Sequence, residues 1–549
     1  MKHSTEFDAD AGRRLFDLQR YLSLIDTLYP RFLNQIDRDP DSPTYGSCDR
    51  LFWMCRQHDF DSGVLQQAPL ALAGLSTLAE HGTALGGEHV DSGHRPYWRE
   101  LAFGVAQRNA GLLEKNGLLD EYYPGEQSLP GTVFAAYATL KSADIFGFDE
   151  IVSHPGLRKT AERLLVRHAS PAANQDTAAA AYLALYAKLN DWQSDRCTDV
   201  VGNLLAGIPG ATPFSEYGGG DLGYATVSLN YLAHMLEDQS HDVNAQILEL
   251  AGFIADFVSP KGGLGGEYAS RSTTYFLPYG LVTAARQSGA LAVVLGKLNV
   301  QSCFERLDDR YLMHYCFPSL VMGAVSLASA PLPAAAPVVD GVPGEWRVSD
   351  HANRGLLSIR SDRSAVFIGL NKGGTFQAET GEETFIDCGY RIRRGGRVYA
   401  TCVVDEDCQA EVHSTPDGSS VAVTANFLSY RTLVASPLKT VILRVLGFMG
   451  PQLNAYFKKR LIQSPTNLDS VKLKRVIKFD ARANRLEIED HIDGMTDNDR
   501  LEVSPPVSPR LVPSARFFQQ GDVAAFVRHS SAMPFQVSRV LNLSDLKKH

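Results

Sequence analysis

The feature that most constrains the fold of this chain is one apolar stretch, residues 311–339, across which the spacing of apolar residues changes. The stretch contains no Lys, Arg, Asp or Glu and is long enough to be considered as a membrane span. Four prolines interrupt it: Pro318, Pro331, Pro333 and Pro337. A buried helix end followed by an extended linker accommodates these prolines better than a transmembrane helix does. We therefore predict a helical domain at 1–332, a linker at 333–345 and a second domain at 346–549.

Before this boundary, apolar residues recur every three or four positions, which is the spacing of an amphipathic helix. The segments with this spacing are 15–33, 68–78, 98–113, 132–145, 161–167, 177–189, 197–205, 225–236, 245–258, 276–287 and 312–328. Loops rich in Gly, Pro and Asp separate them, and their number favours helix pairs over a compact bundle. Helix pairs pack naturally as a ring or partial ring, so we expect an (α/α) toroid.

After the boundary, apolar residues come in short alternating runs that are typical of β-strands. The runs are 356–359, 365–368, 398–403, 420–423, 476–479 and 486–489. Many short strands without intervening helices predict an antiparallel β-sandwich. The predicted fold class is therefore an α+β multidomain chain, with an N-terminal toroid of helix pairs followed by a C-terminal sandwich.

One segment of the second domain, near 437–463, departs from the strand pattern. Residues 438–462 are basic and amphipathic at helical spacing, inside a chain whose net charge is -9. Two interpretations stay open: an interfacial helix that makes a peripheral contact with anionic lipid, and a helix packed on the sandwich.

Composition excludes some classes of partner. The net charge of -9 and the pI of about 5.9 argue against nucleic acid, because phosphate binding requires a dominant basic surface. The eight cysteines are scattered without metal-ligand spacing and are expected to be mostly free thiols. His81, His89 and His94 lie in one loop but match no standard site, so we predict no metal and no cofactor. The first residues contain no apolar signal segment, which fits a cytoplasmic protein or one whose signal was removed.

The stretch 214–232 has the composition of a carbohydrate site. It brings Glu216, Tyr217, Asp221 and Tyr224 together around three consecutive glycines, directly before a predicted helix. Glycines allow close approach to a ligand, phenols stack on sugars or transfer protons, and carboxylates orient hydroxyl groups. The alternative interpretation is a loop that only caps the helix.

Two further polar and aromatic clusters occur in predicted loops of the helical domain. One contains Tyr45, Asp49, Arg50 and Trp53, and the other contains Tyr123, Glu126 and Gln127. In a helical toroid the loops at one end converge, so distant clusters can line the same groove and bind substrate. Each cluster could equally be a buried polar network that holds helices together.

The order of these features resembles the heparinase II/III-like family of polysaccharide lyases, specifically members associated with bacterial exopolysaccharides. The resemblance covers most of the chain and rests on the order of several motifs. They are 42–50, 121–128, 173–176, 217–224, 265–275, 384–390 and 485–490.

The resemblance implies cleavage of a uronate-containing polysaccharide by β-elimination, in which a base takes the C5 proton and an acid protonates the departing O4. Tyr224 matches the tyrosine that transfers protons. Asn174, with Gln175, is the candidate that neutralises the substrate carboxylate. Arg271, in a loop before Tyr275, is the candidate cation that binds the substrate and favours the phenolate of Tyr224.

One departure from the family pattern concerns the histidine-rich loop that the sandwich contributes in well-studied lyases. The corresponding stretch here, 371–379, contains no histidine. Three possibilities follow: Tyr224 performs both proton transfers, His314 replaces the missing base, or the chain eliminates nothing.

The predicted function is a polysaccharide lyase acting on an acidic bacterial polysaccharide. The alternatives are a uronate epimerase or glycoside hydrolase that uses the same cleft, and a non-catalytic polysaccharide-binding or assembly protein.

Overall fold

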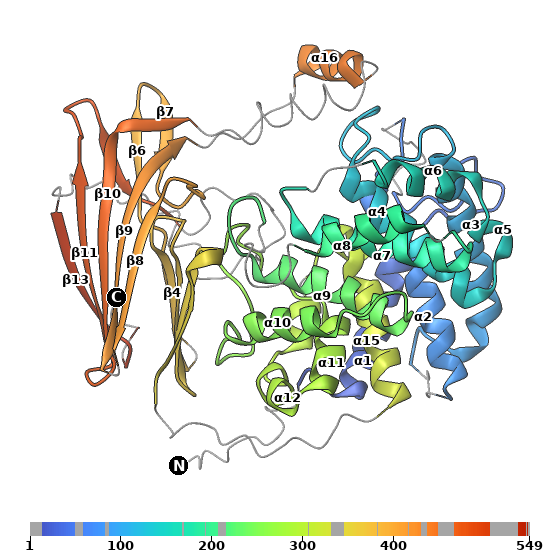
Figure 1. The fold of residues 1–549 in the computed structure, drawn as a ribbon, viewed down its shortest axis with the longest axis horizontal. Coiled ribbons are helices and arrows are strands. Elements are labelled where there is room, and N and C mark those ends of the chain that lie inside the picture. Colours follow the sequence, from blue (N-terminus) through green and yellow to red (C-terminus); the bar gives the residue numbers. More distant parts are fainter. Residues whose placement is uncertain are drawn as a thin grey trace.

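Figure 1 shows the computed structural model of the chain, with a helical part and a part built from β-sheets. The structure describes residues 14–49, 59–82, 87–166, 170–192, 194–206, 216–305, 307–330, 345–381, 383–415, 417–429, 436–447, 466–505, 536–544 and 546. The last helix before the sheets ends at Ser329 and the first strand begins at Arg347. Most of the linker predicted at 333–345 lies outside the described residues, so the domain limits stay a prediction.

Helices make up the first part. They are α1 (Leu18–Asn34), α2 (Ala68–Glu80), α3 (Arg95–Leu113), α4 (Leu129–Phe146), α5 (Asp149–Val152), α6 (Pro155–Leu164), α7 (Ala173–Leu189), α8 (Asp195–Leu205), α9 (Leu222–Glu237), α10 (Asn244–Ala255), α11 (Pro278–Gln287), α12 (Gly289–Leu295), α13 (Val300–Phe304), α14 (Asp309–Tyr311) and α15 (Phe317–Ser329), with a π-helical turn η4 (Leu312–Cys316) between the last two. Each segment that showed helical spacing overlaps one of these helices. The short helices α5, α12 and α13 were missed, because a helix of one or two turns carries too few positions to show a period.

Contacts among the helices run in a closed circuit, from α2 to α4, α7, α9, α11, α15 and back to α2. Helices α1, α3, α8 and α10 pack against the outside of this circuit. The sequences explain the two positions: α4, α7 and α9 are buried over most of their circumference, whereas α1, α6 and α8 bury only one stripe.

The apolar stretch that marked the predicted boundary is a buried helix. Within the described residues, one helix, Asp309–Ser329, has the length and apolar composition to cross a membrane. Most of it is buried inside the molecule. It packs against α2, α11 and α1. This agrees with the interpretation of the stretch as a core helix end.

Antiparallel strands form two sheets in the second part. The five-stranded sheet contains β1 (Arg347–His351), β2 (Leu356–Arg360), β3 (Ser364–Gly369), β4 (Thr375–Thr380) and β5 (Glu383–Asp387) in sequence order. The eight-stranded sheet contains β6 (Tyr390–Arg394), β7 (Arg397–Ala400), β8 (Gln409–Thr415), β9 (Gly418–Ser429), β10 (Asn467–Asp480), β11 (Arg485–Asp493), β12 (Arg500–Val503) and β13 (Gln536–Asn542). Its order is β12-β6-β7-β9-β10-β11-β13, with β8 also paired to β9.

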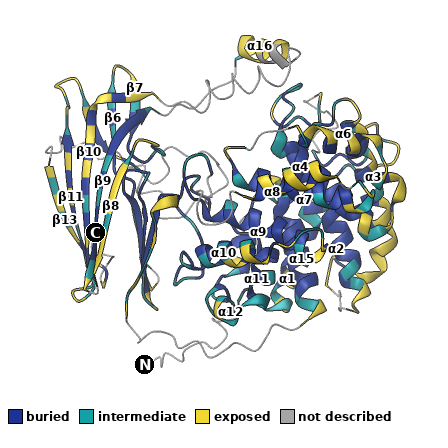
Figure 2. Cartoon of the chain, viewed as in Figure 1, coloured by how far each residue is buried: buried dark blue, intermediate teal, exposed yellow. Residues whose placement is uncertain are grey.

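The middle strands of the five-stranded sheet, β2, β3 and β4, are buried on both faces. Leu357, Ile359 and Val366 pack with residues of β9, β10 and β11 in a core between the two sheets. The alternate positions Leu356 and Phe367 belong instead to the core of the helical part. Figure 2 draws β2, β3 and β4 in the colour of buried residues, between the helices and the larger sheet.

Polar contacts also tie this sheet to the end of α10. The Ser358 hydroxyl donates to the carbonyl oxygen of Asp256 at 2.6 Å, and Arg360 donates to the carbonyl oxygen of Ala255 at 2.7 Å. His351 Nε2 lies 3.0 Å from the carboxylate of Asp256. Apolar and polar contacts therefore join the five-stranded sheet to the helical part.

A buried ion network lies inside the sheet part. Arg475 on β10 is 0% exposed and contacts Asp490 at 2.7 Å and Asp387 at 2.9 Å. Arg539 contacts the same two carboxylates, at 2.6 Å to Asp387 and 2.7 Å to Asp490. Both aspartates lie in stretches that carry the sequence resemblance, and here they serve the packing of strands.

The basic segment near 437–463 forms helix α16 (Pro437–Gly447) in its described part. Figure 1 shows α16 apart from both sheets, so this helix is not packed on the sandwich. Residues 448–465 lie outside the described residues.

The described cysteines agree with the expectation of free thiols. None of Cys48, Cys197, Cys303, Cys316, Cys388, Cys402 and Cys408 forms a disulfide, and all but Cys408 are buried.

Candidate functional site

The N-terminus of α9 and the loop 265–275 are held together by one carboxylate. Asp221 caps α9 by accepting a hydrogen bond from the Tyr224 amide at 3.2 Å. It also accepts hydrogen bonds from the Arg271 amide at 3.1 Å and from the hydroxyl of Thr273. The side chain is fully buried. We predicted a substrate contact for Asp221, but its oxygens are occupied by the protein, so its role is to position Tyr224 and Arg271.

A second buried carboxylate, Glu216, joins α7 to the glycine-rich turn. It accepts hydrogen bonds from the Asn174 amide backbone at 3.0 Å and from the Asn174 side chain at 2.6 Å. Burial raises the pKa of Glu216 to about 8, although both hydrogen bonds act to lower it. Glu216 is therefore mostly protonated at neutral pH, and Asn174 is a buried partner of this carboxyl group.

The Arg271 guanidinium lies over the ring of Tyr217, with its central carbon 4.6 Å from the ring centroid. Among the described residues, no carboxylate lies within ion-pair distance of Arg271, and its buried Nε has no hydrogen-bond partner. Tyr217 has a φ of 57°, which is unfavourable for a tyrosine. Its hydroxyl accepts a hydrogen bond from Gln175 at 3.3 Å. The strained backbone places the ring under the guanidinium.

Tyr224 is partly exposed, and its hydroxyl makes no hydrogen bond to a described residue. Burial and the neighbouring Tyr311 raise the pKa of Tyr224 well above its usual value of 10.0, while Arg271 acts to lower it. We expected the arginine to favour the phenolate, but burial has the larger effect and keeps the pKa of Tyr224 raised. At neutral pH Tyr224 carries its proton.

A group of tyrosines packs behind Tyr224. The Tyr224 ring meets the ring of Tyr275 edge to face at 6.1 Å, and the Tyr275 hydroxyl lies 2.9 Å from that of Tyr315. Tyr275 is fully buried, so it supports Tyr224 and does not face a ligand, contrary to its predicted substrate contact.

His314 lies in the π-helical turn η4 and stacks on Tyr311 at 5.1 Å. Both ring nitrogens are buried without a hydrogen-bond partner. Burial and the nearby Arg310 lower the pKa of His314 to about 3. A histidine with this pKa is neutral and only weakly basic, so the structure argues against His314 as the general base.

The sheet part contributes the stretch 371–379 to this place, as the sequence resemblance suggested, but with other side chains. The Asn371 amide donates to the Gly218 carbonyl at 2.5 Å. The buried Lys372 ammonium donates to the carbonyl oxygens of Glu267 and Ala269 and to the Ser272 hydroxyl, each at 2.8 Å. A Cβ at Gly219 would lie 2.6 Å from Asn371 Nδ2, which explains the glycine there.

Lys372 was missed by the sequence analysis. Its acceptors are mostly main-chain carbonyls about a hundred residues earlier in the chain, and such partners leave no pattern in the sequence. The one signal nearby was the turn Gly373-Gly374, where both residues have positive φ.

The third predicted cluster lies close to the tyrosines. Tyr311 interacts electrostatically with Tyr224 and with Tyr122, whose side chain is 64% exposed. Glu126 is buried and accepts a hydrogen bond from the Tyr122 amide at 2.7 Å, so it holds this loop and is not open to substrate. Tyr123 is partly exposed beside it.

Gln127 and Asp49 serve local turns. Gln127 has a φ of 54°, and its amide donates to Asp120 at 2.9 Å. Asp49 accepts a hydrogen bond from the Ser62 amide at 3.2 Å, and the Ser62 hydroxyl donates to the carbonyl oxygen of Glu121 at 3.0 Å. These bonds link the second predicted cluster to the third.

Tyr45 packs against Gly104 of α3 and lines a shallow depression there. None of the other residues lining this depression belongs to the predicted sites, so Tyr45 is not placed with Tyr224. Arg50 and Trp53 lie outside the described residues.

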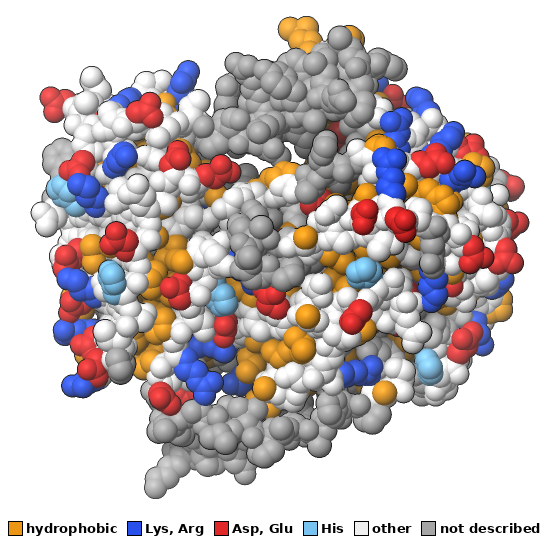
Figure 3. All heavy atoms as spheres, viewed as in Figure 1, with side chains coloured by type: hydrophobic (Ala, Val, Ile, Leu, Met, Phe, Trp, Pro, Cys, Tyr) orange, Lys and Arg blue, Asp and Glu red, His pale blue; other side chains and the backbone are white. Residues whose placement is uncertain are grey.

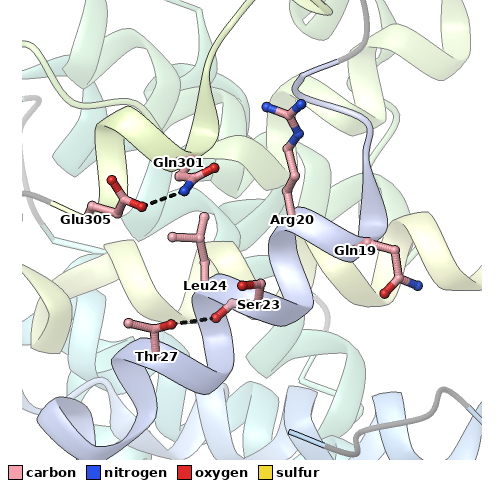
Figure 4. Close-up of a pocket in the computed structure, with 7 residues that line it drawn as sticks. All are labelled: Gln19, Arg20, Ser23, Leu24, Thr27, Gln301 and Glu305. Carbon is pink, nitrogen blue, oxygen red and sulfur yellow. Dashed lines mark hydrogen bonds between the residues drawn. The ribbon is translucent and has the colours of Figure 1, made fainter. Parts of the chain in front are cut away.

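Figure 4 shows a separate hollow of about 260 Å³ between α1 and α13. It is lined by Gln19, Arg20, Ser23, Leu24, Thr27, Gln301 and Glu305, and Gln301 donates to Glu305 at 2.6 Å. None of these residues belongs to the Tyr224 cluster. No group of three or more His, Cys, Asp and Glu side chains that could hold a metal ion occurs within the described ranges.

Comparison with known proteins gives weak similarity only. No family model matches the sequence, and no curated protein matches it. Among solved structures, the alignment with heparinase III covers 89% of this chain and 79% of heparinase III, at 9% identity and a TM-score of 0.40. The chondroitin AC lyase of Streptomyces coelicolor A3, solved with chondroitin sulphate, covers 92% of this chain over 74% of its own, at 11% identity and a TM-score of 0.41. Values this low assign neither a family nor a substrate to this chain.

Proposed function

We propose that this protein is a polysaccharide lyase that cleaves an acidic, uronate-containing bacterial polysaccharide by β-elimination, with Tyr224 as its proton-transfer group. The closed circuit from α2 to α15 would be the (α/α) toroid that carries the site. The observation that carries the proposal is the closeness of a partly exposed Tyr224 to an Arg271 guanidinium that, among the described residues, has no carboxylate within ion-pair distance and a buried Nε without a hydrogen-bond partner.

Elimination requires a cation or amide at the substrate carboxylate, because the C5 proton becomes acidic only when the developing enolate is stabilised. Arg271 is held by Tyr217 and by Asp221 through its backbone, which leaves its guanidinium for such a carboxylate. Asn174 and Gln175 lie in the first turn of α7, where they contact Glu216 and Tyr217, and they would support this contact with the substrate.

Tyr224 would then take the C5 proton as a phenolate and return it to O4. The C5–H bond and the C4–O4 bond break, a C4=C5 double bond forms, and the tyrosine ends as it began. Because the pKa of Tyr224 is raised, the phenolate is scarce at neutral pH, and the rate of a reaction with Tyr224 as sole base rises with pH.

The test is ultraviolet absorbance, since the unsaturated uronate product absorbs where its substrate does not. We expect wild-type protein to produce this absorbance with at least one polymer from a panel of acidic bacterial polysaccharides and glycosaminoglycans. Tyr224→Phe should lower kcat by about 10²–10⁴-fold, the usual contribution of a positioned proton-transfer group. Tyr97→Phe, an exposed tyrosine on α3, is the matched control and should leave the rate unchanged.

A Tyr224→Phe variant with wild-type activity would exclude the proposed role. New reducing ends without absorbance would indicate a hydrolase, and exchange of the C5 hydrogen with solvent without cleavage would indicate an epimerase.

A second candidate is a non-catalytic polysaccharide-binding or assembly protein. The observation that favours it is the sandwich stretch 371–379, where Asn371 and Lys372 bind main chain and no histidine is present. Binding of an acidic polysaccharide without any chemical change, lost in Arg271→Met but kept in Tyr224→Phe, would support this candidate.

A further inference from the structure

Helix α16 exposes an apolar face. Among the described residues, Leu438, Val441, Ile442 and Val445 are 70%, 57%, 46% and 57% exposed. At about 100° per residue these four positions lie on one side of a helix. Six other large apolar side chains are comparably exposed, and they are scattered over the rest of the described structure. Figure 3 shows apolar atoms at the outer edge, where Figure 1 places α16.

Arg444 flanks the apolar face of α16, and its guanidinium contacts the Asp59 carboxylate of the helical part at 2.9 Å and 3.2 Å. This ion pair is exposed and therefore weak. The contact leaves the four apolar side chains of the face exposed.

The charge of the segment indicates what this face meets. Residues 436–465 contain five basic residues, Lys439, Arg444, Lys458, Lys459 and Arg460, and no Asp or Glu, in a chain with a net charge of -9. Basic residues without acidic ones, in the same stretch of sequence as an apolar helix face, are complementary to acidic headgroups above an acyl layer. A second copy of the same helix would instead bring like charges together.

We propose that α16 docks on an anionic phospholipid surface, with Leu438, Val441, Ile442 and Val445 at the boundary between headgroups and acyl chains. The inference is independent of the proposed lyase activity. It places the protein at a membrane face while Tyr224 and Arg271 remain in the body of the molecule.

The test is co-sedimentation of the full chain with vesicles, either of phosphatidylcholine alone or of equal parts phosphatidylcholine and phosphatidylglycerol. We expect binding to the phosphatidylglycerol vesicles, weakened by added salt. Val441→Asp combined with Val445→Asp should lower the partition coefficient at least about tenfold, because two charges replace apolar contacts with the acyl layer. Lys439→Gln should lower it about fivefold.

The matched control combines Val503→Asp with Val540→Asp, two valines of similar exposure on β12 and β13. It should bind as wild type does. Because all these side chains are exposed, the variants should keep the fold, which far-ultraviolet circular dichroism can check. Equal binding of both α16 and control variants would overturn the proposal, as would an absence of wild-type binding. A concentration-dependent dimer, abolished by the α16 variant without vesicles, would show that a second copy covers the face instead.

Discussion

Two buried or half-buried arginines in this molecule have opposite surroundings. Arg475, between the sheets, contacts Asp387 and Asp490, and both carboxylates are paired again by Arg539. Arg271, in the helical part, lies on an aromatic ring without a carboxylate at ion-pair distance among the described residues. A buried charge that is fully paired serves the fold, whereas one held in place without its counter-ion is available for a ligand.

The neighbouring acids follow the same division. Burial alone would raise the pKa of Asp387, but Arg475 and Arg539 hold it well below its usual range. Burial raises the pKa of Glu216 to about 8, and the nearby Arg271 only reduces this shift. The sheet part therefore keeps Asp387 charged, and the candidate site keeps Glu216 largely neutral.

The largest expected effect is a loss of stability when the paired arginine, Arg475, is replaced. Arg475→Met should lower the free energy of unfolding by about 3–5 kcal/mol, because two buried carboxylates lose their main counter-ion. Chemical denaturation measures this. Arg482→Met, which breaks an exposed ion pair with Asp417, should change the free energy of unfolding by no more than about 1 kcal/mol. Equal losses in both variants would mean that the network contributes no more than a surface pair.

Replacement of Arg271 should instead reduce activity or binding and leave stability nearly unchanged. Arg271→Met should reduce kcat/KM, or binding of an acidic polysaccharide if no reaction occurs, by about 10–100-fold, the value of a charged hydrogen bond to a carboxylate. Its free energy of unfolding should change by no more than about 1 kcal/mol, since only the contact with the Tyr217 ring is lost. Arg271→Lys should recover part of the affinity. A stability loss as large as that of Arg475→Met would contradict the contrast.

The last prediction concerns the pH dependence of stability. With the pKa of Glu216 raised from 4.5 to about 8, the folded protein retains a proton that the unfolded chain releases above pH 4.5. The stability from this proton is complete below pH 4.5 and is lost as pH rises to about 8. Glu216→Gln cannot release a proton, so its free energy of unfolding should fall less steeply between pH 5 and 8.

Denaturation curves of wild type and Glu216→Gln across that pH range would check this difference. Parallel pH profiles would show that Glu216 is charged in the folded state, as the acids around Arg475 are.

Local patterns in the sequence predicted the helices and the long strands. Helices such as α7 and α9 and strands such as β10 and β11 bury their own apolar positions at regular spacing, and this spacing is visible in the sequence. Seven described strands lie outside the predicted alternating runs: β1, β4, β5, β6, β8, β12 and β13. The sequence of β1, Arg347–His351, does not alternate. Its pairing with β2 across the turn defines it as a strand.

The candidate site was predicted less completely. The structure brings Asn174, Glu216, Tyr217, Tyr224 and Arg271 together, as the motifs suggested. The sequence could not show which of the polar residues face outward. Asp221, Glu126 and Tyr275 have the same side-chain chemistry as residues that could bind a ligand, but they are buried in the scaffold.

The five-stranded sheet has a consequence for how this protein can be divided. Its strands place Leu357 and Ile359 in one hydrophobic core and Leu356 and Phe367 in another. Cutting the chain between Ser329 and Arg347 would separate two pieces by sequence but would strip one face of the sheet and expose its apolar side chains to water. Each half produced alone is therefore expected to aggregate more readily than the full chain.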